Sequence, residues 1–247
     1  MYLNLKKYGL SDRFEQEASL YNNLFPARII EQHRDLYKVV CEHGELIAGI
    51  SGKLAYHAAD QMSFPAVGDW VMIDRTDNNS GNAVIKNILG RKSVFVRQTA
   101  GTSNEQQIVA ANIDIIFICM SLNSDFNIRR IERYLAVTWD SMATPVIVLT
   151  KSDLCDDLQE KLDELSSVSI GIDVIVCSSE DENGYQAVSS YIEKGKTIAF
   201  IGSSGVGKST LINRLAGDES QAVSEIRKGD DKGKHTTTYR QLKLLPN

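Results

Sequence analysis

The chain has 247 residues, of which 43% are hydrophobic and 24% charged, a composition typical of a folded globular protein with one or two domains. No apolar run reaches the length of a membrane span, and the polar start of the chain predicts no signal peptide. The four cysteines are widely spaced and form no C-x-x-C pair, so we expect free thiols in a reducing compartment, the cytoplasm.

The net charge of −5 argues against simple binding of polyanions, but the charge is unevenly distributed. The stretch from residue 86 to residue 97 contains four basic residues and no acidic one: Lys86, Arg91, Lys92 and Arg97. Such a cluster could bind the phosphates of RNA, and a solvated strand edge explains the charge equally well.

Apolar residues in the first part of the chain come in short bursts separated by turn residues. They predict five strands, at residues 27–30, 36–41, 46–50, 69–74 and 83–88. Five short strands predict an all-β barrel over residues 25–97, with an OB-fold as the commonest choice and an SH3-like barrel as the alternative. Residues 1–24 are predicted to be an N-terminal extension with a short helix.

The pattern changes after the barrel. Residues 98–112 are polar and weakly periodic, and we interpret them as a linker. Apolar strand runs then alternate with amphipathic helices. Strands are predicted at residues 113–119, 145–149, 174–177 and 197–201, and helices at residues 128–142, 158–166 and 185–193 and from the following loop to residue 215. This alternation predicts an α/β domain with a mostly parallel sheet over residues 113–247.

A phosphate-binding loop is predicted between the last of these strands and the helix after it. The residues Gly202, Ser203, Ser204, Gly205, Val206, Gly207, Lys208 and Ser209 fit the pattern G-x-x-x-x-G-K-[ST]. Glycines let backbone N–H groups turn toward the β-phosphate, Lys208 places a charge on the β/γ-oxygens, and Ser209 offers a hydroxyl to Mg²⁺. We predict that these residues and Thr210 bind a nucleotide and that Lys208 also takes part in catalysis.

A guanine-reading tetrad, Thr150-Lys151-Ser152-Asp153, ends a strand earlier in the chain. Asp153 would accept hydrogen bonds from the guanine N1–H and N2–H₂ groups, and Lys151 would lie along the base. Adenine lacks that pair of donors and would leave the carboxylate unpaired, at a cost of about 1–3 kcal/mol. Ser178 and Ser179 end the next strand, where a backbone N–H would meet guanine O6, although a plain strand terminus is equally consistent.

Beyond the phosphate loop, residues 217–234 are charged and glycine-rich and lead into a run of threonines. Such a segment is typical of a first switch, in which Thr237 would bind Mg²⁺ and the γ-phosphate. His235 is a candidate for positioning the attacking water. The base reader precedes the phosphate loop, which is the reverse of the usual order in GTPases. The order predicts a circularly permuted P-loop GTPase domain behind the barrel.

With its barrel segment Pro65-Ala-Val-Gly-Asp-Trp-Val71 and its Gly233-Lys-His-Thr-Thr-Thr238 run, the chain resembles the RsgA (YjeQ) family. The resemblance implies GTP or GDP and Mg²⁺ as ligands, and GTP hydrolysis stimulated by the small ribosomal subunit. It also implies a maturation role on the bacterial 30S subunit through contacts to 16S rRNA. We expect a monomer that does not bind membranes.

The chain departs from the family pattern in one way. The resemblance implies that an Asp-x-x-Gly switch and then a C-terminal zinc domain follow Thr238, and residues 239–247 contain neither this motif nor zinc ligands. We therefore expect an incomplete GTPase domain, either a fragment or a truncated relative with weak hydrolysis. Two other functions stay open from the residues: a P-loop enzyme that uses ATP, and an RNA-binding module with a passive nucleotide clamp.

Overall fold

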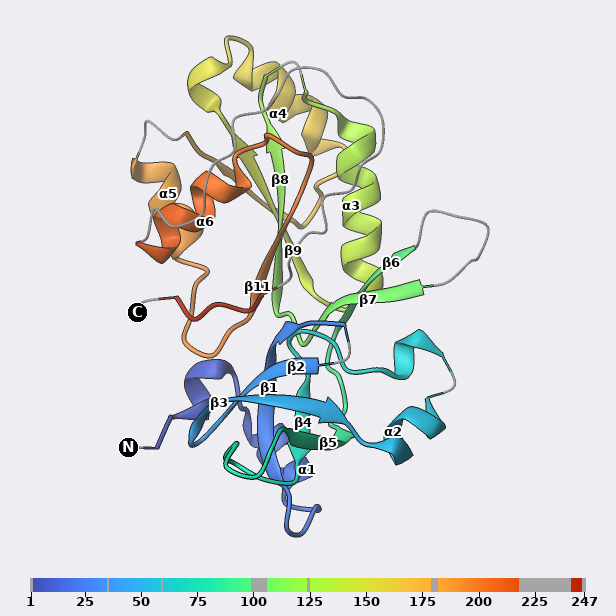
Figure 1. The fold of residues 1–247 in the computed structure, drawn as a ribbon. Helices are drawn as coiled ribbons and strands as arrows, with labels where there is room; N and C mark the ends of the chain where they lie inside the picture. The colour runs from blue at the N-terminus through green and yellow to red at the C-terminus, as the bar shows by residue number, and fades with distance from the viewer. Residues whose placement is uncertain are drawn as a thin grey trace. The chain divides into compact units, whose positions relative to one another are not determined.

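The computed structural model describes residues 2–34, 36–58, 60–98, 106–123, 125–178, 182–217 and 241–245. The described residues form two compact units (Figure 1). The first contains the chain up to residue 113 together with residues 194–197 and 241–244, and the second contains residues 114–193 and 198–217. The predicted domain boundaries stay predictions.

The first unit is built on a closed barrel with the strand order β1-β2-β3-β5-β4. The strands are β1 (Phe25–Gln32), β2 (Leu36–Cys41), β3 (Gly44–Ile50), β4 (Trp70–Ile73) and β5 (Ala83–Ile88). All neighbouring strands are antiparallel except β3 and β5, which run parallel. A helix, α2 (Gly52–His57), follows β3, and a 3₁₀ turn (Gln61–Ser63) precedes β4. This arrangement confirms the OB-fold-like barrel and not the SH3-like alternative.

The predicted N-terminal extension packs on this barrel. It forms a 3₁₀ turn (Leu5–Tyr8) and helix α1 (Asp12–Ala18). The buried side chains Leu5 and Phe14 form a cluster with the barrel residues Trp70, Met72 and Leu89. The short helix is therefore held on the barrel by its buried residues Phe14 and Ala18.

Arg28 of β1 is a buried cation that joins several segments of the first unit. Its side chain donates to the carbonyl oxygens of Tyr8 and Gly68 and to Thr197 Oγ1, the last at 2.7 Å. The guanidinium also lies over the ring of Trp70, 5.6 Å from its centroid. One arginine thus fastens both the N-terminal turn and residues 194–197 to the barrel.

The interpretation of residues 98–112 as a linker is wrong in part. Strand β6 (Val94–Gln98) pairs in antiparallel fashion with strand β7 (Gln106–Ala111). Ile108 and Ala111 of β7 are buried, and the backbone N–H of Ala111 donates to the carbonyl of Val67. The polar residues of this segment conceal a strand that is stabilised by pairing with β6 and by the contact with Val67, which local periodicity does not reveal.

Arg91, predicted as an RNA contact, is committed to the interior of the first unit. It forms a bidentate pair with the fully buried carboxylate of Asp69, with distances of 2.8 and 2.7 Å. It also donates to the carbonyl oxygens of Met62 and Phe64, each at 2.7 Å. Burial raises the pKa of Asp69, and the hydrogen bond from Arg91 acts in the opposite direction. We therefore withdraw Arg91 from the RNA-binding set, because its donors are used within the protein.

The second unit contains a parallel sheet with the strand order β10-β9-β8-β11. Its strands are β8 (Ile115–Ser121), β9 (Thr144–Thr150), β10 (Asp173–Val176) and β11 (Ile198–Ile201). Its helices are α3 (Ile128–Asp140), α4 (Leu158–Ser166), α5 (Glu182–Ser189) and α6 (Lys208–Ala216), with a 3₁₀ turn at Ser152–Leu154. Figure 1 shows α3 on one side of the strands and α5 and α6 on the other. The α/β prediction is confirmed.

Alternating side chains of β8 form the centre of this unit. Phe117 and Cys119 pack in a cluster with Leu211 and Leu215 of α6. Every β8 residue after the first is buried, as expected for a central parallel strand covered on both faces. No helix within the described part of the chain is both long and apolar enough to cross a membrane.

Replacing Arg91 by Ala should destabilise the barrel by about 3–5 kcal/mol, because it leaves a buried carboxylate without its cation. Urea unfolding monitored by the fluorescence of the buried Trp70, in a Trp139→Phe background, measures the loss. The loss should shrink as the pH falls toward the ordinary pKa of an aspartate, since burial raises the pKa of Asp69 and a neutral carboxyl needs no cation.

Arg129→Ala serves as the matched control for that experiment. Arg129 pairs with Glu132 through a side chain that is 87% exposed, so its loss should cost less than about 1 kcal/mol. Equal effects of the two substitutions would contradict the structural role of Arg91.

Candidate nucleotide-binding site

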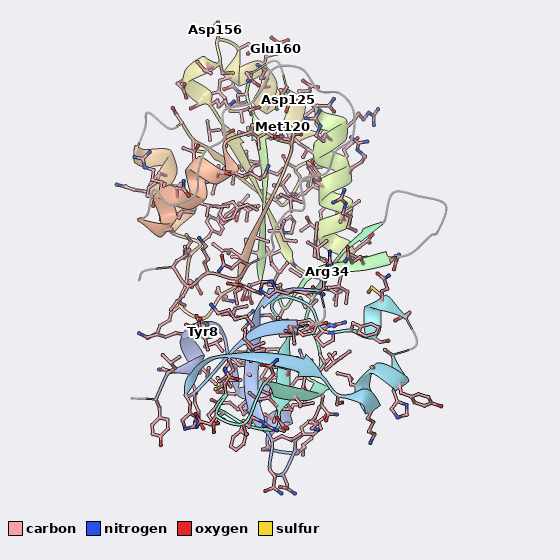
Figure 2. All side chains as sticks on the ribbon, viewed as in Figure 1. Tyr8, Arg34, Met120, Asp125, Asp156 and Glu160 are labelled. Carbon is pink, nitrogen blue, oxygen red and sulfur yellow. The ribbon has the colours of Figure 1, made fainter. Side chains whose placement is uncertain are left out.

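The predicted nucleotide motifs meet at one edge of the second unit's sheet. In a parallel sheet the carboxyl ends of all strands lie at the same edge, which is where open α/β sheets bind their ligands. The phosphate loop follows β11, the tetrad begins at the last residue of β9, and Ser178 follows β10. The end of β8 and the segment after it lie at this edge too, and Figure 2 labels Met120 from the strand and Asp125 from the segment.

Glycines shape the phosphate loop. The φ angles are +147° at Gly202, +78° at Gly205 and +94° at Gly207, values that residues with a Cβ atom rarely adopt. A Cβ atom at Gly202 would also overlap the carbonyl oxygen of Cys119 in the neighbouring strand. Helix α6 begins directly after Gly207, whose lack of a side chain leaves the first-turn N–H groups without a side-chain cap. Such a helix start is suited to binding an anion.

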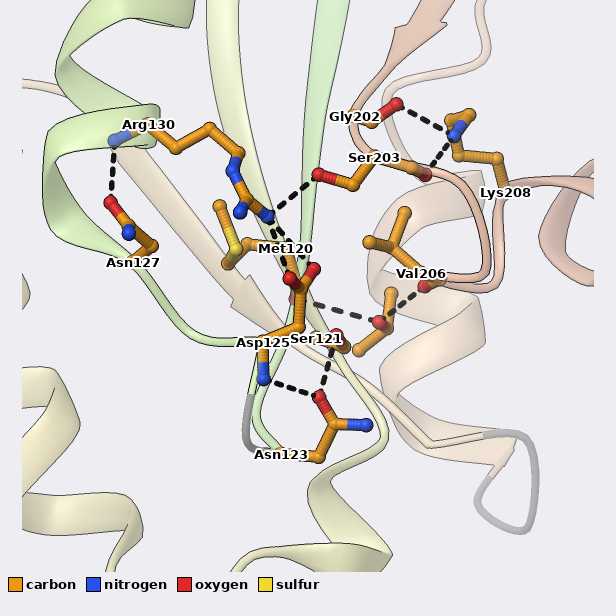
Figure 3. Close-up of polar contacts among 11 residues, drawn as sticks. Met120, Ser121, Asn123, Asp125, Asn127, Arg130, Gly202, Ser203, Val206 and Lys208 are labelled. Atoms are coloured by element: carbon orange, nitrogen blue, oxygen red, sulfur yellow. Dashed lines mark hydrogen bonds and ion pairs between the residues drawn. The ribbon is translucent and has the colours of Figure 1, made fainter. Parts of the chain in front are cut away.

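Lys208 reaches back over the loop. Its Nζ donates to the carbonyl oxygens of Gly202 at 2.8 Å and Ser203 at 2.5 Å (Figure 3). Burial lowers the pKa of Lys208, and the buried Cys119 thiol behind the loop has its pKa raised to about 12. A partly desolvated ammonium beside a helix start gains strongly from an anionic partner.

Thr150 connects the tetrad with the phosphate loop. Its Oγ1 donates to the carbonyl oxygen of Val206 at 2.6 Å. Both residues are buried, Thr150 with 6% of its surface exposed and Val206 with 1%. The threonine that stands where GTPases usually have asparagine therefore positions the loop through its hydroxyl.

The remaining tetrad residues are arranged around the end of β10. Lys151 has left-handed backbone angles (φ 59°, ψ 41°), which turn the chain sharply after β9. Asp153 is exposed, and its Oδ1 accepts a hydrogen bond from the buried hydroxyl of Ser178. The backbone N–H of Ser152 donates to the carbonyl of Cys177 at 3.3 Å. An oriented, exposed carboxylate at this edge can accept hydrogen bonds from a base.

Some predicted site residues lie outside the described residues. They are Ser179, His235 and Thr237. Ser204, Ser209 and Thr210 are described and exposed along the loop and the first turn of α6. Among the described residues, no group of three or more His, Cys, Asp or Glu side chains could hold a metal ion. Ser209 provides an oxygen at the position where a P-loop binds Mg²⁺.

Sequence reasoning missed a polar cluster beside the loop. Arg130 Nη1 donates to Ser203 Oγ at 2.7 Å and to both carboxylate oxygens of Asp125 at 2.9 Å (Figure 3). The cluster begins at the carboxyl end of β8 and continues into the first turn of α3, which Asn127 caps. The available signal was the run of polar residues between a buried strand and a helix. That junction lies at the carboxyl edge of the sheet, where ligands bind, so it could have indicated a site.

The other predicted RNA contacts lie in the first unit. Lys86 is exposed on β5, Lys92 is half-buried, and Arg97 is exposed on β6. The structure describes their exposure, and their proposed binding to RNA stays a prediction.

A phosphate loop that follows a Thr-Lys-Ser-Asp tetrad along the chain, in a parallel-sheet domain preceded in sequence by an OB-like barrel, defines a circularly permuted P-loop GTPase. The comparisons agree, since a family model described as RsgA GTPase matches residues 88–247. The chain belongs to the RsgA GTPase family. The GTPase interpretation is thereby confirmed, and the alternative of an enzyme that uses ATP receives no support.

Two curated relatives illustrate the match. The chain is 52% identical to the small ribosomal subunit biogenesis GTPase RsgA 2 of Lactiplantibacillus plantarum, covering 100% of this chain and 69% of the relative. It is 42% identical to the small ribosomal subunit biogenesis GTPase RsgA 1 of Listeria innocua, covering 98% of this chain and 67% of the relative. The chain thus spans about two thirds of their length.

Solved structures support the fold. YjeQ from Thermotoga maritima matches with a TM-score of 0.62 and 25% identity, over 77% of this chain and 64% of the other. YloQ, a circularly permuted GTPase, matches with a TM-score of 0.58 and 22% identity, over 79% of this chain and 65% of the other. The chain therefore spans slightly less than two thirds of each of these proteins.

Replacing Thr150 by Val should lower the affinity for GDP roughly tenfold, because the carbonyl of Val206 loses its buried partner, at a cost of about 1–3 kcal/mol. Titration with a fluorescent GDP measures the change. Thr150→Ser retains the hydroxyl and should stay within about threefold of the parent protein. Binding by the valine variant as tight as that of the parent would disprove the linking role.

Proposed function

We propose that the protein hydrolyses GTP to GDP and phosphate while acting as an assembly factor of the bacterial 30S ribosomal subunit. The observation that supports the proposal most directly is the Thr150–Val206 hydrogen bond, which joins the tetrad to the phosphate loop. The relatives' names support the biological role, since both are small ribosomal subunit biogenesis GTPases.

In this proposal the loop from Gly202 to Ser209, with Thr210, binds the phosphates of GTP or GDP. Backbone N–H groups at the start of α6 and the ammonium of Lys208 neutralise the phosphate charge. Ser209 would hold Mg²⁺, which supplies charge neutralisation at the phosphate oxygens when bound. His235 and Thr237 are the proposed water-positioning residue and switch residue.

Base selection in this proposal depends on the tetrad. Asp153, oriented by Ser178, accepts from the two donors of guanine, while Lys151 lies along the base and Thr150 holds the loop. The backbone at Ser178 and Ser179 would meet guanine O6. Because a site that hydrogen-bonds the N–H groups of one base rejects an analogue that lacks them, the site should prefer guanine over adenine.

The barrel is the proposed contact to 16S rRNA, through Lys86, Lys92 and Arg97. Basic side chains on an OB-like barrel bind nucleic acid mainly through phosphates, so the affinity should fall as salt is raised. The proposed setting is the cytoplasm, with the protein acting as a monomer on the ribosomal subunit.

Replacing Asp153 by Asn should lower GDP affinity at least about tenfold, because an amide cannot accept from both guanine donors. The same variant should bind xanthosine diphosphate better than the parent does, since xanthine has a carbonyl where guanine has an amino group. Competition of GDP, ADP and xanthosine diphosphate against a fluorescent nucleotide provides the measurement. Tight ADP binding by the parent would rule out guanine recognition.

Small ribosomal subunits should accelerate GTP hydrolysis by the complete protein. Intrinsic turnover is expected to be slow, on the order of 10⁻⁴ to 10⁻² s⁻¹, because groups that position the reactants come from the partner. Phosphate release with and without saturating subunits tests this, and Ser209→Ala should abolish the stimulation. Large subunits serve as the control, and turnover that ignores small subunits would refute the ribosomal role.

A further inference from the structure

The most developed polar cluster that the proposed roles leave unused lies beside the phosphate loop, around Arg130. The backbone N–H of Arg130 donates to the side chain of the capping residue Asn127 at 3.0 Å. Its side chain is 25% exposed and is held by Asp125, whose backbone N–H donates to Asn123 Oδ1 at 3.1 Å. Ser121, the last residue of β8, donates to the same oxygen at 2.9 Å. The arginine is therefore fixed at both its backbone and its side chain.

The guanidinium uses only part of its donor capacity within the described residues. Nη1 contacts both Asp125 oxygens and Ser203 Oγ. An arginine has five N–H groups, and three of them belong to Nε and Nη2. For these three the described residues show no hydrogen-bond partner, and guanidinium N–H groups are suited to phosphate oxygens.

Two cations converge on Ser203. Lys208 Nζ donates to its carbonyl oxygen at 2.5 Å, and Arg130 Nη1 donates to its hydroxyl at 2.7 Å (Figure 3). The lysine of a phosphate loop reaches the β- and γ-phosphates. With GTP bound as proposed, Ser203 and Arg130 would therefore lie on the side of the loop nearest the terminal phosphate.

We propose that Arg130 is a positioning residue for the terminal phosphate. Through its hydrogen bond to Ser203 it holds the start of the phosphate loop beside Lys208. Asp125 compensates its charge and fixes its side chain. The inference rests on the proposed binding of GTP and adds that one arginine makes the site favour the triphosphate over the diphosphate. Arg130 provides this preference from within the same unit, on helix α3.

The test compares affinities for GDP and for a slowly hydrolysed GTP analogue, measured by fluorescent-nucleotide titration on the full chain. Arg130→Gln should weaken binding of the analogue roughly tenfold while GDP binding changes less than about threefold, because only the analogue carries the terminal phosphate. Arg129→Gln removes the same charge from the adjacent, exposed position and should leave both affinities within about twofold.

Ser203→Ala provides a second, independent variant that keeps the Arg130–Asp125 pair. It should also weaken binding of the analogue selectively. The double variant should be no weaker than Arg130→Gln alone, since residues that act through one contact are not additive. If the Arg130→Gln variant does not fold, Ser203→Ala alone tests the inference. It must then lose affinity for the GTP analogue but not for GDP.

Several results would overturn the inference. They are equal losses for GDP and the analogue, additive losses in the double variant, and the same selective loss in Arg129→Gln. A parent protein that binds neither guanine nucleotide would instead refute the proposed function itself. The parent's binding therefore separates failure of the proposed function from failure of this inference.

Discussion

The candidate site depends on the hydrogen bond that Thr150 donates to the carbonyl oxygen of Val206. In the proposed site, phosphate and base are recognised by different segments, so a nucleotide fits only if the distance between those segments is fixed. Both partners of this bond are buried, so water competes poorly for them and the carbonyl would be costly to leave unpaired. One hydroxyl at the end of β9 thus sets the position of the loop after β11.

The permuted order of the motifs has little effect on this geometry, because the sheet decides which segments are neighbours. Strand β8 pairs with both β9 and β11, all in parallel. Ser121 therefore lies beside Thr150, and Ile118 lies beside Ile201, the residue before the phosphate loop. Cys119, the next residue of β8, comes so close to Gly202 that only glycine fits. Lateral pairing brings the loop and the tetrad to the same edge, whichever of them comes first along the chain.

Features with local causes could be predicted from the sequence, and those with distant partners could not. The barrel strands, the parallel strands and the phosphate loop each follow from a short-range pattern of apolar residues and glycines. Strand β7 was not predicted, because its pairing with β6 decides its conformation. Arg91 was assigned to the surface because its partner Asp69 lies 22 positions earlier in the chain. A basic residue predicts an RNA contact only when it is not paired with a buried carboxylate in the folded protein.

The same limit explains why the sequence does not distinguish Arg130 from its neighbour Arg129. It follows another arginine, and nothing in the local sequence separates the two. On a helix, successive residues point about 100° apart, so neighbours face different surroundings. Arg129 points outward and is 87% exposed, whereas Arg130 turns toward the sheet edge and is 25% exposed. Asp125 and Ser203 then give Arg130 two partners, one of them 73 positions away. The helix places one of two identical charges beside the phosphate loop, and that placement gives Arg130 its proposed role.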